Sequence, residues 1–300
     1  MKRSIFDSNS EKNLFRKIDS RWSKYVEVYP QIPVRNVIGY HQIKSLDMPE
    51  KAKDYLLNTA FDFVVCELQT AIPILAIEFD GIGGGFSQDE QYISKVVPIN
   101  DPYRKLKMQR KLEACMFSMV PLVVLSFNEC DFINQSNDML MVVDAIIGQA
   151  LECQYYNKNI SEHTQKLSEA FEFGGNEAVE MYSIELDVRA EQMNPIKNKI
   201  IEITNKFPFW THQIVFPQKK ADHVEGRFYL RSGIKIVEGK MKQKVLLFVD
   251  IAMREVNFIG TENWQIFNTI GEYCLARKTE KIIGYDRTSW ECAIEQAQWI

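Results

Sequence analysis

Short apolar runs and helical stripes alternate along the chain, and they predict a helix followed by a sheet. In residues 8–22, Ser8 and Glu11 form a capping-box pattern ahead of an apolar stripe, which predicts a helix. Residues 61–67 (FDFVVCE) and 74–80 (ILAIEFD) are apolar runs of strand length, separated by a connection short enough for a hairpin. The pattern therefore predicts two antiparallel strands after the first helix.

A third strand and a crossover helix are predicted around this hairpin. Residues 24–38 are rich in β-branched and aromatic residues, but two prolines restrict the segment to a bent or edge strand. Asp101 as N-cap and Pro102 at the first helical position predict the start of a second helix. Because the apolar segment 121–127 follows directly, we expect a right-handed crossover that places it parallel to 74–80. The apolar stripe expected on the crossover helix consists of Leu106, Leu112, Cys115 and Met119.

The pattern of apolar and polar positions changes in the second half of the chain, and this change predicts a second domain. Residues 137–156 have the pattern of a helix that closes the first domain, and polar and glycine-containing sequence between 155 and 177 predicts a boundary. We expect a first domain at residues 1–155 and an α+β domain at 156–300. The elements expected in the second domain are strands at 179–191, 210–216, 226–239 and 244–253, and helices at 194–207 and 263–277.

The composition is that of a globular protein without a transmembrane segment. Of the 300 residues, 46% are hydrophobic and 25% charged, and the longest apolar runs are far shorter than the roughly 20 residues that span a bilayer. The formal net charge of -4 excludes a global positive field that would draw the chain to nucleic acid or to an anionic membrane. Six scattered cysteines without a C-x-x-C pair, and a start without an apolar signal core, favour a soluble cytoplasmic protein.

Carboxylates at the end of the predicted hairpin are the strongest chemical signal in the sequence. Glu78 and Asp80 point to the same side of their strand, and the hairpin brings Asp62 roughly opposite Glu78 and Phe79. The three carboxylates meet if the pairing register turns Asp62 to that same side. Like charges this close are unfavourable unless they share a proton or a cation, and hard oxygen ligands suit Mg2+ or Mn2+. The alternative is that these acids merely face water. The glycine-rich segment that follows, GIGGGFSQDE, lacks the spacing and the lysine of a phosphate-binding loop.

Basic residues gather in the segment RKLKMQRK at 104–111. Lys105 and Gln109 are four residues apart and share a helix face, so Lys105 would reach a phosphate if this face met the acids. The alternative is an ordinary solvated helix face. Glu11 is most simply a capping residue, with a second role at a metal as the alternative.

Five motifs, in their order along the chain, resemble the restriction-endonuclease-like PD-(D/E)XK nuclease superfamily, in its bacterial branch with an IE-x-DG strand. The first three are NSEKNLF in a helix, then YPQIPV and FDFVVCE in strands; LAIEFDG and the helix start DPYRKLK follow. The resemblance covers about residues 8–130. It implies an α/β fold with a restriction-endonuclease-like mixed-sheet core and flanking helices, followed by the second α+β domain.

The resemblance also implies a metal site and its residues. Asp62 and Glu78, with the backbone carbonyl of Phe79, would hold Mg2+ or Mn2+, and the metal would activate water for attack on a phosphodiester. Glu11 would assist at the metal from the first helix, and Gln31 would line the site.

The chain departs from the superfamily pattern at two places. Asp80 stands where the superfamily usually has a lysine, so the cation that stabilises the developing negative charge is expected to come from Lys105. The glycine-rich segment stands where relatives with this strand motif commonly have a histidine.

The sequence therefore favours a metal-dependent nuclease acting on DNA, in bacterial or phage defence or repair. A second interpretation is a catalytically reduced nuclease fold that binds nucleic acid or a protein partner within an assembly. A third is an unrelated α/β enzyme that uses a metal on a small phosphoester. Residues 156–300 would select the substrate, form a homodimer or bind a protein partner, and no membrane partner is expected.

Overall fold

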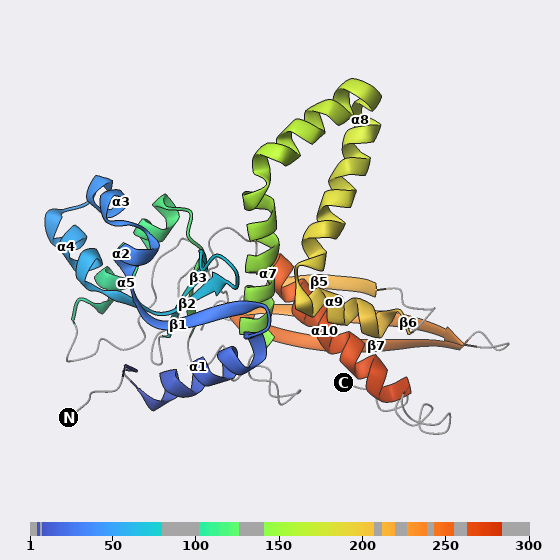
Figure 1. Ribbon diagram of the computed structural model, residues 1–300. Helices are drawn as coiled ribbons and strands as arrows, with labels where there is room; N and C mark the ends of the chain where they lie inside the picture. The colour runs from blue at the N-terminus through green and yellow to red at the C-terminus, as the bar shows by residue number, and fades with distance from the viewer. Residues whose placement is uncertain are drawn as a thin grey trace. The chain divides into compact units, whose positions relative to one another are not determined.

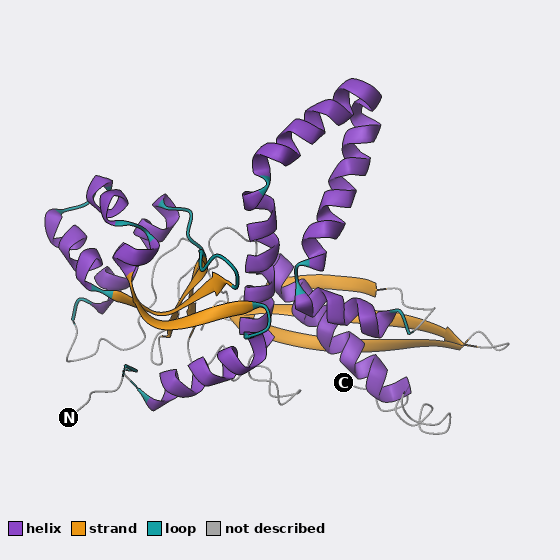
Figure 2. Cartoon of the chain, in the orientation of Figure 1, coloured by secondary structure: helices purple, strands orange, loops and turns teal. Residues whose placement is uncertain are grey.

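The protein has a mixed α/β architecture that divides into two compact units (Figures 1 and 2). The first unit holds the described residues up to Ile147, and the second holds most of those from Gly148 onward. No helix in the described part of the chain is long and apolar enough to cross a membrane. The computed structural model describes residues 5–6, 8–79, 102–125, 141–206, 212–219, 227–238, 243–254 and 263–283.

A four-stranded mixed sheet forms the centre of the first unit. Its strand order is β1-β2-β3-β4; the pairs β1/β2 and β2/β3 are antiparallel, and β4 is parallel to β3. The predicted edge strand, hairpin and parallel fourth strand are thus confirmed. The elements of this unit are α1 (Asn9–Trp22), β1 (Val26–Pro33), α2 (Val34–Val37), α3 (Tyr40–Ser45), α4 (Glu50–Asn58), β2 (Ala60–Glu67), β3 (Pro73–Phe79), α5 (Arg104–Phe117) and β4 (Leu122–Leu125).

Helix α1 begins where the capping pattern predicts. The hydroxyl of Ser8 accepts a hydrogen bond from the backbone N–H of Glu11 at 3.1 Å, which satisfies one of the unpaired donors of the first turn. At the other end of the helix, the indole of Trp22 donates to the carboxylate of Asp144 at 2.7 Å, and Arg21 pairs with the same carboxylate at 3.2 Å. These contacts attach α1 to α7 (Met141–Lys158) within the first unit.

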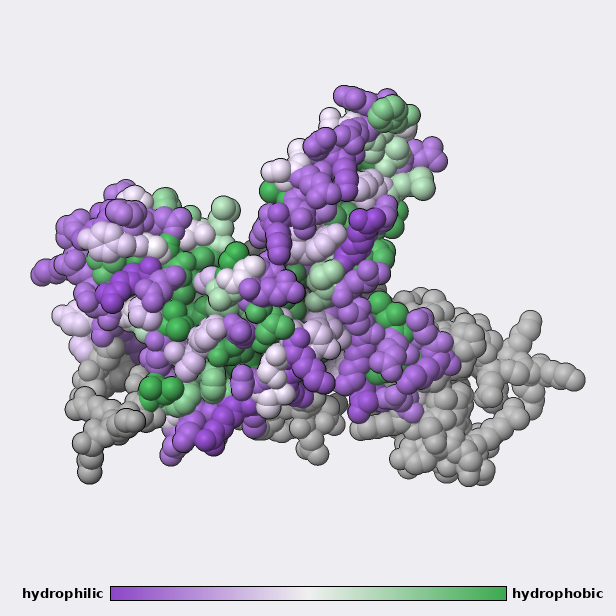
Figure 3. Space-filling view, viewed as in Figure 1, coloured by the Kyte–Doolittle hydropathy of each residue, from purple (hydrophilic) through white to green (hydrophobic). Residues whose placement is uncertain are grey.

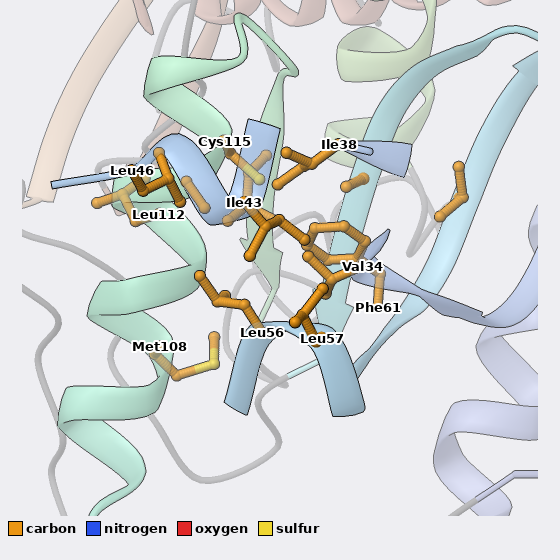
Figure 4. Close-up of a cluster of buried hydrophobic side chains, with 14 of the residues drawn as sticks. Val34, Ile38, Ile43, Leu46, Leu56, Leu57, Phe61, Met108, Leu112 and Cys115 are labelled. Carbon is orange, nitrogen blue, oxygen red and sulfur yellow. The ribbon is translucent and has the colours of Figure 1, made fainter. Parts of the chain in front are cut away.

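A hydrophobic cluster packs α2, α3, α4 and α5 against one face of the sheet (Figure 4). Alternate residues of the strands, such as Val64, Ala76 and Val124, belong to it together with Leu112 and Cys115 of α5. Since side chains alternate along a strand, Glu78 follows Ala76 on the face that α5 covers. The predicted strand 24–38 ends at Pro33, and residues 34–37 are helical instead; α3 and α4 lie in a stretch for which the sequence pattern gave no prediction.

Helix α5 differs from its prediction in where it begins and in which face it buries. It begins at Arg104, after a turn, and not at Pro102; Asp101, the predicted N-cap, lies outside the described residues. Two members of the predicted stripe are exposed, Leu106 by 51% and Met119 by 86%. The buried stripe instead consists of Met108, Lys111, Leu112 and Cys115, which has the i, i+3, i+4, i+7 spacing of a core-facing helix.

The second unit contains helices and a separate three-stranded sheet of order β5-β6-β7, in which β5 and β6 are antiparallel. Ile200 and Ile203 of α9 pack with Ala276 of α10 in a small apolar cluster. The three predicted strands after residue 209 and both predicted helices are confirmed. The elements, after the end of α7, are α8 (Ile160–Gln192), α9 (Pro195–Thr204), β5 (His212–Lys219), β6 (Arg227–Glu238), β7 (Gln243–Arg254) and α10 (Asn263–Ile283).

Helix α8 corrects one prediction, because residues 179–191 are helical and not a strand. The segment 155–177, where the sequence pattern predicts a domain boundary, is helical along most of its length. Gly175, with φ +63°, interrupts α8 and lets the chain turn back on itself, so the helix forms two arms (Figure 1). The strand prediction failed because apolar residues occupy two opposite faces of the second arm, which imitates the alternation of a strand.

A buried polar network lies between α7, α8 and α9. Asn194 is fully buried; its side-chain oxygen caps α9 by accepting from the backbone N–H of Ile196 at 3.0 Å, and its amide donates to Glu152 at 2.6 Å. The ammonium of Lys197 donates to Glu152 at 3.0 Å and to Glu191 at 2.9 Å. This network fixes the start of α9 against the base of the α8 arms.

Candidate functional site

The β2/β3 register brings Asp62 and Glu78 together. Phe63 pairs with Ile77, and one residue further from the turn the same register places Asp62 opposite Glu78. The carboxylate of Asp62 also accepts a hydrogen bond from the backbone N–H of Phe79 at 2.7 Å. Asp62 is thereby fixed to β3, and two acids meet at the end of the hairpin away from its turn.

Lys111 supplies a cation to these acids. Its ammonium lies 2.6 Å from Oε1 of Glu78 and donates to the backbone carbonyl of Ala60 at 2.7 Å. Burial lowers the pKa of Lys111, but the charge of Glu78 and the hydrogen bond to it, together with Tyr55 and Asp62, outweigh burial and raise the pKa above its usual value. The side chain is therefore a protonated ammonium in a site from which water is largely excluded.

The sequence pattern had assigned this role to Lys105, which occupies a different part of α5. Lys105 is exposed near the start of the helix, whereas Lys111 forms the ion pair with Glu78. Six residues along an α-helix rotate the side chain to a direction about 120° away, so both lysines cannot face the same acid. The signal that identifies Lys111 is a lysine inside the apolar stripe formed by Met108, Leu112 and Cys115.

Gln31 connects Asp62 to Glu11 of α1. Its amide donates to Oε1 of Glu11 at 2.8 Å and lies 3.4 Å from Oδ1 of Asp62. The backbone of Gln31 has φ +54°, a left-handed conformation that is unfavourable for a residue with a side chain and that persists only where its surroundings enforce it. It falls between the β1/β2 pairs formed by Pro30 and Ile32. The strained residue thus sits at the position that directs its amide toward both acids.

The structure places most of the predicted site residues in one contiguous set. Glu11, Gln31, Asp62, Glu78 and the backbone of Phe79 are joined by the contacts above, and Glu11 and Glu78 are only 3% and 6% exposed. Asp80 lies outside the described residues. Within the part of the chain that the structure describes, no three His, Cys, Asp or Glu side chains converge closely enough to hold a metal by themselves.

Cys115, one turn after Lys111, does not offer a nucleophile to this site. Burial, together with the nearby charge of Glu78, raises the pKa of its thiol far above the usual range, although Lys111 lowers it. It belongs to the hydrophobic cluster that packs α5 against the sheet (Figure 4).

Comparison with known proteins gives a match over the first third of the chain. Residues 2–97 match the model of a family described as Protein of unknown function (DUF2726). That segment contains Glu11, Gln31, Asp62 and Glu78 and ends before Lys111. No curated protein and no solved structure matches the chain.

Proposed function

We propose that the first unit is a metal-dependent phosphodiester hydrolase, a nuclease that acts on DNA, with its site at the end of the β2/β3 hairpin. The observation that carries the proposal is the buried ammonium of Lys111, 2.6 Å from Glu78 and beside Asp62. Acids paired with a cation in a water-poor site form the donor and charge set that phosphoryl chemistry requires. A strained glutamine that bridges two of the acids supports a functional rather than a purely structural origin.

The oxygen donors fit a hard divalent cation. Asp62 and Glu78 contribute carboxylate oxygens at neighbouring register positions, with the backbone carbonyl of Phe79 as the third donor in the proposal. Mg2+ usually binds through one or two carboxylates and keeps several waters, so a convergence of three side chains is not required. Bound Mg2+ would supply Lewis-acid activation of the phosphodiester and of water.

Side chains of the protein would stabilise the developing charge and orient the acids. Lys111 would place its positive charge where negative charge develops on the phosphate, at an ammonium that the backbone carbonyl of Ala60 holds in position. Gln31 would fix the orientation of the Asp62 and Glu11 carboxylates. Arg104 and Lys105, near the start of α5, would contribute charge toward a polyanion backbone.

The sheet topology supports the same proposal. The site strand β3 has an antiparallel neighbour on one side and a parallel neighbour on the other, and α5 connects β3 to that parallel neighbour. A mixed sheet with a crossover helix is compatible with the PD-(D/E)XK resemblance, and Lys111 would take the place of the lysine that the strand lacks.

The test is cleavage of circular DNA, linear DNA and RNA by the purified full chain in Mg2+ and in Mn2+. Glu78→Gln keeps an acceptor for Lys111 but removes the charge, and we expect it to lower cleavage by at least about 100-fold. Glu67→Gln, at the opposite end of β2, is the matched control and should cleave like the unchanged protein. Equal cleavage by the Glu78 and Glu67 variants would exclude this site.

A second candidate is a nuclease-fold module that binds nucleic acid or a protein without cleaving. The close Lys111–Glu78 ion pair favours it, because the cation already neutralises one of the two acids. Retained DNA binding with no metal-dependent cleavage, and no heat of Mg2+ binding by calorimetry, would select this candidate.

A further inference from the structure

The second arm of α8 has an apolar stripe on each of two opposite faces. The inner stripe faces the first arm of α8. Leu186 is 8% exposed, Ala190 is 1% exposed, and the hydroxyl of Tyr182 lies 3.1 Å from Nδ1 of His163 on that first arm. The outer stripe, which we define as Met181, Ile184 and Val188, is exposed by 68%, 57% and 48%. Its i, i+3, i+7 spacing places these three side chains on one face.

The outer stripe is not needed to hold the two arms together. Tyr182 with His163, and the hydroxyl of Tyr156 with Asp187, already connect the second arm to its neighbours. Two further large apolar residues, Phe171 and Phe173, are exposed near the tip. In Figure 3, apolar side chains (green) follow the outer edge of the arm from its tip downward. An exposed apolar stripe of this kind is typical of a surface that another molecule covers.

The charge of α8 identifies the chemistry of that molecule. Residues 160–192 contain eight acidic and two basic residues, a net charge of -6, whereas the whole chain has -4 and the remainder therefore +2. Among the described residues, basic side chains pair with Glu162, Glu185 and Glu191. The other five acids, Glu169, Glu172, Glu177, Glu180 and Asp187, form no ion pair with any basic residue that the structure describes.

This negative field excludes several occupants. A two-fold contact with a second copy of the chain would bring an arm of the same charge against the first, since such a contact juxtaposes the same surface. Nucleic acid and anionic membranes carry the same sign of charge as the arm. The remaining class is a protein segment with an apolar face and basic flanks.

We propose that the outer stripe is the docking site for a basic amphipathic helix of a protein partner. The apolar face of that helix would cover Met181, Ile184 and Val188, in the manner of helix recognition through i, i+3 and i+7 anchors. Its lysines or arginines would lie against Glu177 and Glu180, which precede the stripe on the same arm. The site is independent of the chemistry proposed for the first unit.

The probe is a fluorescein-labelled amphipathic peptide of about 18 residues, built from leucine and lysine, which is long enough to be helical on binding. Its matched partner carries glutamate in place of lysine. Fluorescence anisotropy with the full chain should detect binding of the lysine peptide only. A triple variant replaces the outer stripe with serine (Met181→Ser, Ile184→Ser and Val188→Ser), and it should weaken binding at least about 10-fold. A double variant that reverses the nearby charge (Glu177→Lys and Glu180→Lys) should weaken binding by at least as much.

Controls separate the stripe from general stickiness and charge. Leu68→Ser with Ile72→Ser changes exposed apolar residues of the first unit, and Asp19→Lys with Asp47→Lys makes the same change of charge there; both should bind the lysine peptide like the unchanged protein. Because the outer stripe is exposed, circular dichroism of its triple variant should show unchanged helix content. Equal binding by the stripe variants, equal binding of both peptides, or a self-association that the triple variant abolishes in sedimentation would each overturn the proposal.

Discussion

The ammonium of Lys111 lies 2.6 Å from Oε1 of Glu78, and both side chains are buried. The pair joins α5 to the site strand β3 across 33 residues of sequence. An ion pair this deeply buried is costly to desolvate and is therefore a feature to be tested for function as well as for stability.

Replacing Lys111 should identify the cation that acts in cleavage. If the proposed nuclease is correct, Lys111→Met lowers the cleavage rate about 100-fold or more, because a positive charge at the developing negative charge is lost. Lys111→Arg restores part of that loss, and Lys105→Met, at the position that the sequence pattern favoured, leaves the rate within about 3-fold. A larger effect from Lys105 than from Lys111 would reverse this assignment. Rates are compared at equal concentrations of folded protein.

The Lys111–Glu78 ion pair should also affect the stability of the protein, which can be measured whether or not the protein cleaves DNA. Lys111→Met leaves the charge of Glu78 buried without its partner and should lower the free energy of unfolding by about 3–5 kcal/mol. Adding Glu78→Gln removes that buried charge, so the double variant should recover much of the loss. Urea denaturation of the unchanged protein, the two single variants and the double variant measures the coupling energy between Lys111 and Glu78. Additive losses would show that the two side chains do not depend on each other.

The buried network of the second unit predicts a pH-dependent loss of stability. Burial raises the pKa of Glu152, although Lys197 and Asn194 lower it, so Lys197→Met should raise that pKa further and destabilise the unit by about 3 kcal/mol at pH 7. A carboxyl whose pKa is higher in the folded than in the unfolded state binds protons preferentially when folded. The loss is therefore complete above the raised pKa and shrinks as the pH falls through it. Thermal unfolding between pH 8 and pH 4 measures this trend.

A matched variant separates the role of Lys197 from that of helix α9 itself. Lys199→Met changes a nearby lysine of the same helix, whose ammonium lies over the ring of Tyr273. It should change stability far less, and without the same dependence on pH. If both variants behave alike, the Glu152 carboxylate is not the source of the effect.

At Gly148, within helix α7, substitution by alanine should destabilise the protein. A Cβ at this position would lie 2.2 Å from Oδ1 of Asn194, the fully buried side chain that caps α9. Gly148→Ala should therefore lower stability by about 1–3 kcal/mol, despite the better helix propensity of alanine. In an Asn194→Ala background the clash is absent, and the same substitution should be neutral or stabilising. Equal costs in both backgrounds, measured by thermal unfolding, would contradict the predicted contact.

The sequence by itself determined the elements whose causes are local. The Ser8 cap, the apolar runs of β2 and β3 and the short connection between them predicted the first helix and the hairpin. The hairpin also brought Asp62 roughly opposite Glu78 and Phe79, and the register of the folded sheet then decided that it faces Glu78. The sequence also determined that β4 runs parallel to β3, because a helix lies between the two strands along the chain. These features depend on neighbouring residues and on strand geometry alone.

The tertiary structure decided which cation meets the acids and which helix faces are buried. Lys111 and Lys105 belong to one basic run, and only the packing of α5 on the sheet turns Lys111 toward Glu78 and Lys105 toward solvent. The strained backbone of Gln31 is likewise held by contacts of its side chain with distant segments, Glu11 of α1 and Asp62 of β2. A local pattern records apolar positions, but it does not record which face the rest of the chain covers, because burial is a property of the packed molecule.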